Sequence, residues 1–175
     1  MIPPIPFARA AYVAVSATEI FYANGDRYEF TVYSRDGALL RTVRAAAAPV
    51  PVPRDEVERT LDRYREMATN AAARASLQRQ LDAVKLPTTM PAFGGMEVEP
   101  DGTVWLRNYA YDKDTIPDPV LWARFDPAGR LVGMLETPAG HRVVRFTREH
   151  VILTRYDPDT EATTLFVHRV ERITR

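Results

Sequence analysis

The strongest constraint on the fold is a strand pattern that recurs along the chain. Residues 13–44 hold four short apolar runs separated by turn residues. The pattern recurs over residues 95–137, and again in shortened form over residues 142–173. A strand-and-turn unit that repeats in this way indicates an architecture in which each unit buries an apolar side against the next.

The turns between the apolar runs carry the residues that tight turns need. Asn24-Gly25 and Asp36-Gly37 separate strands in the first unit, and Asp101-Gly102 does so in the second. Glycine adopts positive φ values without a steric penalty, and Asp-Gly is among the strongest short signals for a β-hairpin. Residues 28–33 alternate aromatic and polar side chains, as a half-buried strand does. The pattern therefore predicts four-stranded antiparallel units of the kind that form β-propeller blades.

The expected strands are those at 11–15, 19–23, 28–33, 38–43, 95–99, 103–108, 121–125, 130–136, 143–146, 150–155 and 163–170. They divide a single domain, residues 1–175, into a blade at 10–44, a helical insert at 54–85, a second blade at 93–137 and an incomplete blade at 141–175. The last unit is called incomplete because the residues that follow its third strand are too few and too charged for a fourth.

The insert differs from the rest of the chain in its apolar period. Between residues 54 and 85 apolar side chains recur with the helical period instead of alternating. The stripe that contains Val57 and Leu61 is out of step with the one that contains Leu77 and Leu81, which predicts two helices broken near Asn70.

The ends of the insert carry signals of their own. Asp55 and Glu58 have the spacing of a capping box at the start of the first helix, and Pro87 ends the second. We expect the insert to cap the face of the blades on which the loops gather, and to form a unit separable from the blades.

Composition excludes several classes of function. The 175 residues include no cysteine, which excludes disulfides, thiolate metal sites and cysteine nucleophiles. The 23 basic residues balance 23 acidic ones without a basic stripe, which disfavours a nucleic-acid partner. No apolar run reaches the roughly 18 residues of a membrane span. We expect a cytoplasmic protein if Met1 is the true start, and a periplasmic or extracellular one if a signal peptide lies upstream.

Five segments carry a more specific signature. They are Ile20-Phe21-Tyr22-Ala23, Val32-Tyr33-Ser34-Arg35-Asp36-Gly37, Leu86-Pro87 with Pro91-Ala92-Phe93, Asp101-Gly102-Thr103-Val104-Trp105, and Phe125-Asp126-Pro127-Ala128-Gly129-Arg130-Leu131. Together they resemble NHL-type blades in the C-terminal half of bacterial six-bladed β-propeller proteins that carry a helical insertion. The resemblance implies an all-β fold, a partial propeller of about three four-stranded blades whose last blade is incomplete. It does not fix an activity, because such propellers host hydrolases, lyases and binding modules.

A propeller would place the candidate binding residues on one face. In each blade, the loop after the second strand and the connection to the next blade emerge on the same side, which we call the loop face. The candidate ligand-binding residues there are Tyr109, Asp112, His141, Arg142, Arg155 and Tyr156. His141 with Arg142 and Tyr109 is the best candidate for a catalytic constellation, because acid–base catalysis needs a histidine beside a polar partner.

The sequence predicts neither a metal site nor a cofactor. His141, His150 and His168 are scattered, whereas a histidine metal site needs converging ligands. The acidic residues 157–161 lack the glycine and the length of an EF-hand calcium loop, and no glycine-rich phosphate loop is present. Trp105 and Trp122 fall on strands and are expected to pack between blades.

Two functions of different classes remain open. The favoured one is a non-catalytic binding or interaction module that forms the C-terminal half of a six-bladed propeller, with a small-molecule or protein ligand. The alternative is part of an extracytoplasmic propeller hydrolase or lyase with its site on the loop face. An unfinished ring leaves apolar faces and strand edges open, so the expected partners are upstream blades of the same gene product or a second copy.

Overall fold

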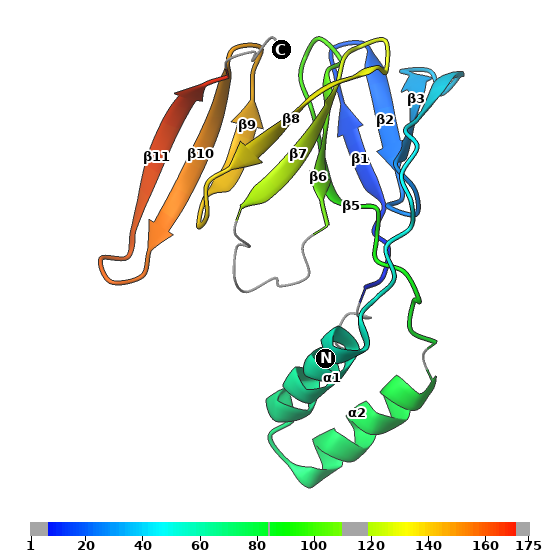
Figure 1. Cartoon of the computed structure of the whole chain (residues 1–175), viewed down its shortest axis with the longest axis vertical. Coiled ribbons are helices and arrows are strands. Elements are labelled where there is room, and N and C mark those ends of the chain that lie inside the picture. The colour runs from blue at the N-terminus through cyan, green and yellow to red at the C-terminus, as the bar shows by residue number, and fades with distance from the viewer. Residues whose placement is uncertain (1–6, 84, 110–118, 171–175) are drawn as a thin grey trace.

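The part of the chain that the computed structural model describes, residues 7–83, 85–109 and 119–170, is mostly β-structure. Its eleven strands form three antiparallel sheets, accompanied by two helices (Figure 1). The first sheet holds β1 (Tyr12–Val15), β2 (Glu19–Ala23), β3 (Glu29–Ser34) and β4 (Leu39–Arg44). The second holds β5 (Phe93–Val98), β6 (Val104–Asn108), β7 (Val120–Phe125) and β8 (Leu131–Thr137). The third holds β9 (Arg142–Phe146), β10 (His150–Asp157) and β11 (Ala162–Arg169).

These strands confirm the strand pattern read from the sequence, each within two residues of its expected ends. In every sheet the strands hydrogen-bond in chain order, so each sheet is a simple antiparallel meander. Such a meander follows from short turns, which leave the next strand no alternative but to pair with the one before it.

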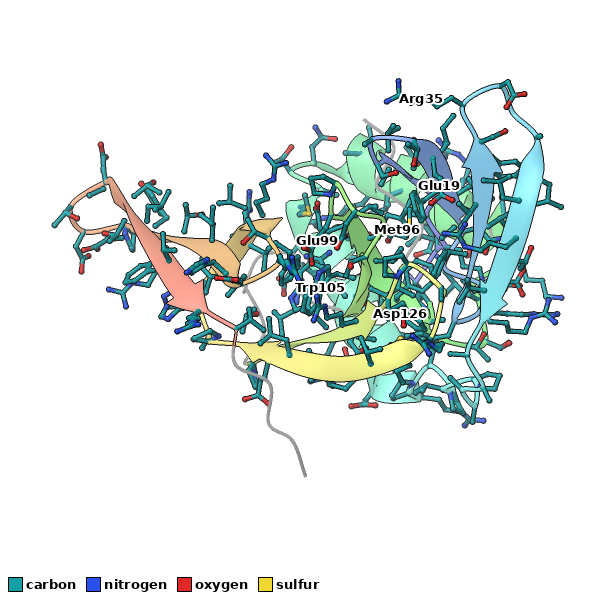
Figure 2. All side chains as sticks on the ribbon, turned by 90° about the horizontal axis from the view of Figure 1, so that it is seen from above. Glu19, Arg35, Met96, Glu99, Trp105 and Asp126 are labelled. Atoms are coloured by element: carbon teal, nitrogen blue, oxygen red, sulfur yellow. The ribbon has the colours of Figure 1, made fainter. Side chains whose placement is uncertain are left out.

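The sheets pack face to face, with their first strands side by side. β1 contacts β5, and β5 contacts β9. Seen from above in Figure 2, the remaining strands spread away from these inner strands to different sides. The first and second sheets enclose one apolar cluster, made of Phe21, Ala23, Phe30, Val32, Val43, Phe93, Met96, Val104, Leu106, Ala123 and Phe125. The second and third enclose another, made of Trp105, Val120, Trp122, Phe146, Val151 and Leu153.

The second cluster confirms that both tryptophans pack between sheets. Trp105 stacks on Phe146, with ring centroids 4.1 Å apart and planes 9° from parallel. Trp122 meets the same ring edge-on at 4.9 Å. Aromatic pairs in these geometries add to the free energy gained from burial alone, so Phe146 joins the third sheet to the second.

The insert consists of α1 (Arg54–Met67) and α2 (Ala71–Ala83), and the break between them confirms the two-helix prediction. Two extended segments, residues 45–53 and 85–92, join the insert to the sheets. Together we call them the stalk. In this stalk Pro51 and Thr89 form a bridge, and the Met90 N–H donates to the Val50 carbonyl at 2.8 Å. Figure 1 shows the helices at the far end of the stalk, away from the sheets, so the expectation that they cap the loop face is wrong.

The expected capping box at the start of α1 is wrong. The N-cap residue is Pro53, and no side chain makes a capping hydrogen bond there. Asp55 lies inside the first turn instead, where its Oδ2 is 2.8 Å from Nη2 of Arg59. With Glu56, it places negative charge at the positive end of the helix dipole, which stabilises the helix without a cap.

We expect the sheets to fold without the insert. Neither apolar cluster between the sheets contains a residue of α1 or α2. Replacing residues 54–85 with a short Gly/Ser linker should therefore preserve the β signal in far-UV circular dichroism and the cooperative thermal transition. A linker that replaces residues 45–92 is the control, because Ala45 and Ala92 pack against the first cluster. Loss of the β signal in the shorter replacement would show that the helices belong to the core.

Candidate functional site

One end of the sheets gathers the connections that the sequence assigns to the loop face. The turns between β2 and β3, β8 and β9, and β10 and β11 emerge at the same end as the insert (Figure 1). We call this the insert end. The turn between β3 and β4 and the turn between β7 and β8 lie at the opposite end. Loops that converge on a rigid scaffold are the usual place for a ligand site.

Two of the expected site residues belong to the connection between β6 and β7. Tyr109 directly follows β6 and is half-buried. Its backbone approaches Gly94 so closely that a Cβ atom at position 94 would lie 3.2 Å from the Tyr109 Cα. Asp112 lies outside the described residues.

Two further candidates meet at Phe166, on the side of the third sheet that faces the second. The His141 ring lies edge-on to Phe166 at 4.9 Å, and its Nδ1 is 2.7 Å from the Ala139 carbonyl oxygen. The guanidinium of Arg155 lies 5.8 Å from the Phe166 ring centre. Cations over an aromatic face are attracted by the ring quadrupole. These contacts give both side chains a packing role around Phe166.

The remaining candidates, Arg142 and Tyr156, lie on the other side of the third sheet. Arg142 pairs with Thr154, and Thr154 and Tyr156 alternate along β10 with the buried Leu153. Alternate residues of a strand point to opposite faces. The structure therefore places Arg142 and Tyr156 on the face opposite to the one on which His141 and Arg155 contact Phe166.

The insert end also holds a hollow that the sequence did not predict. It has a volume of about 450 Å³ and lies between the β2–β3 turn and the stalk of the insert. Its walls are residues 26–28, 44–50 and 89–92. Ligand pockets commonly have volumes of roughly 300–1,000 Å³, so this hollow has the size of a small-molecule site.

Backbone hydrogen bonds fix the walls of the hollow. The Ala45 N–H donates to the Tyr28 carbonyl at 2.8 Å, and the Ala92 N–H donates to the Gly25 carbonyl at 2.8 Å. Both connecting segments are thereby tied to the β2–β3 turn. The Ala46–Pro49 stretch then lines the hollow with small apolar side chains, which leave the space open.

The charged side chains around the hollow are unequally paired. Nε of Arg9 lies 2.5 Å from Oδ1 of Asp26, and Nε of Arg44 lies 2.5 Å from Oε2 of Glu29. Arg27 approaches only the other oxygen of Asp26, at 4.0 Å, and its side chain is 70% exposed. Because Asp26 is already paired, Arg27 gives the rim a net positive charge.

Tyr28 contributes a neutral polar group to the same wall. Its hydroxyl donates to Oδ1 of Asn108, and burial raises the pKa of the phenol above its ordinary value. The phenol therefore stays protonated at neutral pH.

A buried carboxylate lies at the opposite end of the sheets. The Glu99 side chain is 2% exposed and accepts a hydrogen bond from Nε1 of Trp105 at 2.8 Å (Figure 2). Arg124 places Nη2 at 3.9 Å from the carboxylate and its guanidinium 5.3 Å from the Trp105 ring centre. Burial raises the pKa of Glu99 above its ordinary value. The group lies among core residues, so we assign it a structural role.

Comparisons with known proteins give no relative for this chain. No protein-family model matches it, and neither a curated protein nor a solved structure does. Within residues 7–83, 85–109 and 119–170, no helix is long and apolar enough to cross a membrane. The same residues hold no group of three or more histidine or acidic side chains placed to bind a metal ion.

Proposed function

We propose that the chain is a non-catalytic binding module made of three blades of a six-bladed β-propeller. Three features support this: each sheet is a meander in chain order, the first strands β1, β5 and β9 adjoin one another, and the sheets pack face to face. Blades set around a common axis have this arrangement. The strands that spread to different sides in Figure 2 agree with it.

The observation that carries the binding function is the hollow at the insert end. Its apolar wall, residues 46–50, faces a rim on which Arg27 is the least compensated charge. A pocket that is mostly apolar, with a few polar groups to orient the ligand, is the common form of a small-molecule site. We assign it a ligand that joins a carboxylate to a short apolar body, the carboxylate next to Arg27.

Binding explains this site better than catalysis does. The polar groups around the hollow already contact protein partners: Asp26 with Arg9, Arg44 with Glu29, and the phenol of Tyr28 with Asn108. A general acid or base must be free to exchange a proton with the substrate. His141, the candidate for acid–base chemistry, contacts Phe166 on another sheet, and Arg142 lies on the opposite face of that sheet.

Titration with a short carboxylate tests the proposed function. Hexanoate should shift the amide NMR signals of the non-proline residues among 26–28, 44–50 and 89–92, whereas hexanol should shift them much less. Arg27→Ser should weaken hexanoate binding by at least about tenfold, because a hydrogen bond to a charged group contributes about 1.5–3 kcal/mol. The matched control is Arg35→Ser, an exposed arginine in the β3–β4 turn at the opposite end. Equal binding by the two variants, or signal shifts confined to another part of the chain, would contradict the assignment.

A further inference from the structure

The face of the first sheet that points away from the second is apolar and open to solvent. Val13, Val15 and Tyr22 are exposed by 67%, 58% and 40%. Val13 pairs with Tyr22, and Val15 pairs with Ile20. Since directly paired residues share a face, these side chains form one continuous surface, which we call the first end face.

The third sheet has an equivalent face on the other side of the structure. Leu165, Val167 and Tyr156 are exposed by 60%, 59% and 59%. Leu165 pairs with Thr154, and Val167 pairs with Ile152. They form the second end face, on the side of the third sheet that points away from the second.

The chain itself shows what covers a face of this kind. The first sheet covers one apolar face of the second, and the third sheet covers the other. A further sheet packed on either end face would extend this stack in the same way. Contiguous apolar surface, as opposed to scattered apolar residues, marks an interface.

We propose that a second copy of the chain covers both end faces. The first end face of each copy packs on the second end face of the other, and the two copies close into a ring. This inference rests on the proposed propeller architecture, because only sheets set around an axis would close with two copies. Figure 2 shows the first sheet on the right, β8 below and β11 on the left, which leaves the fourth side for the partner.

The charges of the two faces favour this unlike pairing. Three exposed arginines lie on the second end face, as the pairing of their strands shows: Arg142, Arg145 and Arg169. Two second end faces brought together would place these arginines against one another, and like charges in contact are destabilising. On the face of the first sheet, Arg44 is already neutralised by Glu29. Unlike pairing therefore buries the apolar surface of both faces without opposing the arginines.

Sedimentation velocity tests the proposal, and a discrete dimer at tens of micromolar is the expected state. Val15→Arg and Leu165→Arg should each yield monomers, raising the dissociation constant by at least about 100-fold, because each buries a further positive charge in an interface that already contains Arg142, Arg145 and Arg169. Met134→Arg is the matched control: Met134 is 52% exposed but lies on β8, outside both end faces. It should remain a dimer.

Mixing the two monomeric variants tests which faces meet. Val15→Arg retains an intact second end face and Leu165→Arg an intact first one, so an equimolar mixture should recover part of the dimer. Circular dichroism checks that the variants are folded. If a variant is not folded, Val15→Thr or Leu165→Thr replaces it, because threonine suits an exposed strand. These substitutions should weaken the dimer measurably.

A monomeric wild type, a dimer that resists both end-face substitutions, or an open-ended polymer would overturn the two-copy ring. A mixture that stays monomeric would overturn the unlike pairing. Hexanoate titration of the same variants separates the two proposals. Monomers that still bind hexanoate with Arg27 dependence would show that the dimer had failed and the binding site had not.

Discussion

Gly129→Ala is expected to destabilise the protein by about 3 kcal/mol, and the same change at Gly37 by only about 1 kcal/mol. The two glycines occupy equivalent hairpin turns, with φ values of +83° and +89°. The Gly129 N–H donates to the Asp126 carbonyl at 2.8 Å, and the Gly37 N–H donates to the Ser34 carbonyl at 3.0 Å. The cost of a side chain in the left-handed region is therefore common to both.

The surroundings of the two turns differ. A Cβ atom on Gly129 would overlap Cγ2 of Val43 and lie 3.2 Å from its Cγ1, whereas nothing lies within 4 Å of one on Gly37. Val43 belongs to the cluster between the first and second sheets, and a buried β-branched side chain has few rotamers with which to withdraw. The Gly129 turn is thus held against the neighbouring sheet.

Urea unfolding of both variants measures the difference, and Val43→Ala identifies its cause. In the Val43→Ala background the overlap is gone, so the cost of Gly129→Ala should fall to that of Gly37→Ala. The coupling between positions 43 and 129 should then be about 2 kcal/mol, which is typical of residues in contact. Equal costs at the two glycines in the wild-type background would show that the turn is free to move away from Val43.

The strands were predictable because their signals are local. In the first sheet, residues 28–33 alternate along the strand and Asp36-Gly37 supplies the positive φ of the turn, and β3 and β4 follow directly. The capping box failed for the opposite reason. The spacing of Asp55 and Glu58 is one of several signals that can start a helix. Here Pro53 occupies the N-cap position, so Asp55 lies inside the first turn.

The faces of the candidate residues were harder to predict, because a register shift intervenes. Counting back by two from the buried Phe146 would place Val144 and Arg142 on its face. A shift in the pairing of β9 with β10 instead aligns Val143 with Leu153 and moves Arg142 to the other face. Nothing in the local sequence marks this shift, so the face on which Arg142 lies could only come from the structure.

The hollow was not predictable for a different reason, which is the distance along the chain between its walls. Residues 26–28 and 89–92 lie side by side only because the insert leaves and returns through one stalk, closed by the Pro51–Thr89 bridge. In the sequence, residues 45–53 indicate no more than a connector. Arg27 gains its significance only when Asp26 is seen to be paired with Arg9.

Trp105→Phe is expected to cost about 2–3 kcal/mol, most of it through the loss of one hydrogen bond. Phenylalanine can keep the stack on Phe146, but it has no donor for the Glu99 carboxylate, which is 2.8 Å from Nε1 of Trp105. Of its two partners among the described residues, the buried carboxylate would then retain Arg124, at 3.9 Å. In a Glu99→Gln background the acceptor is neutral, so the same substitution should cost about 1 kcal/mol.

The pH dependence of stability provides a second measurement of the same pair. Because burial raises the pKa of Glu99 in the folded state above its ordinary value of 4.5, the folded protein binds this proton more tightly than the unfolded chain. The Glu99 contribution to stability is therefore most favourable below the unfolded pKa and is lost as pH rises through the folded pKa. Wild type should lose stability relative to Glu99→Gln as pH rises from about 4 to 7. Comparing the two proteins at each pH removes the contributions of the other carboxylates, which both proteins share.

Trp105→Phe should steepen this dependence on pH. The Trp105 hydrogen bond lowers the pKa of Glu99 and so opposes the effect of burial. Without the donor, the folded-state pKa rises further, and the ionised carboxylate becomes less favourable at neutral pH. The penalty of Trp105→Phe should therefore grow between pH 4 and pH 7 and shrink again under acid, where Glu99 is protonated in both states. A penalty that stays constant over this range would mean that Trp105 stabilises the fold by packing alone.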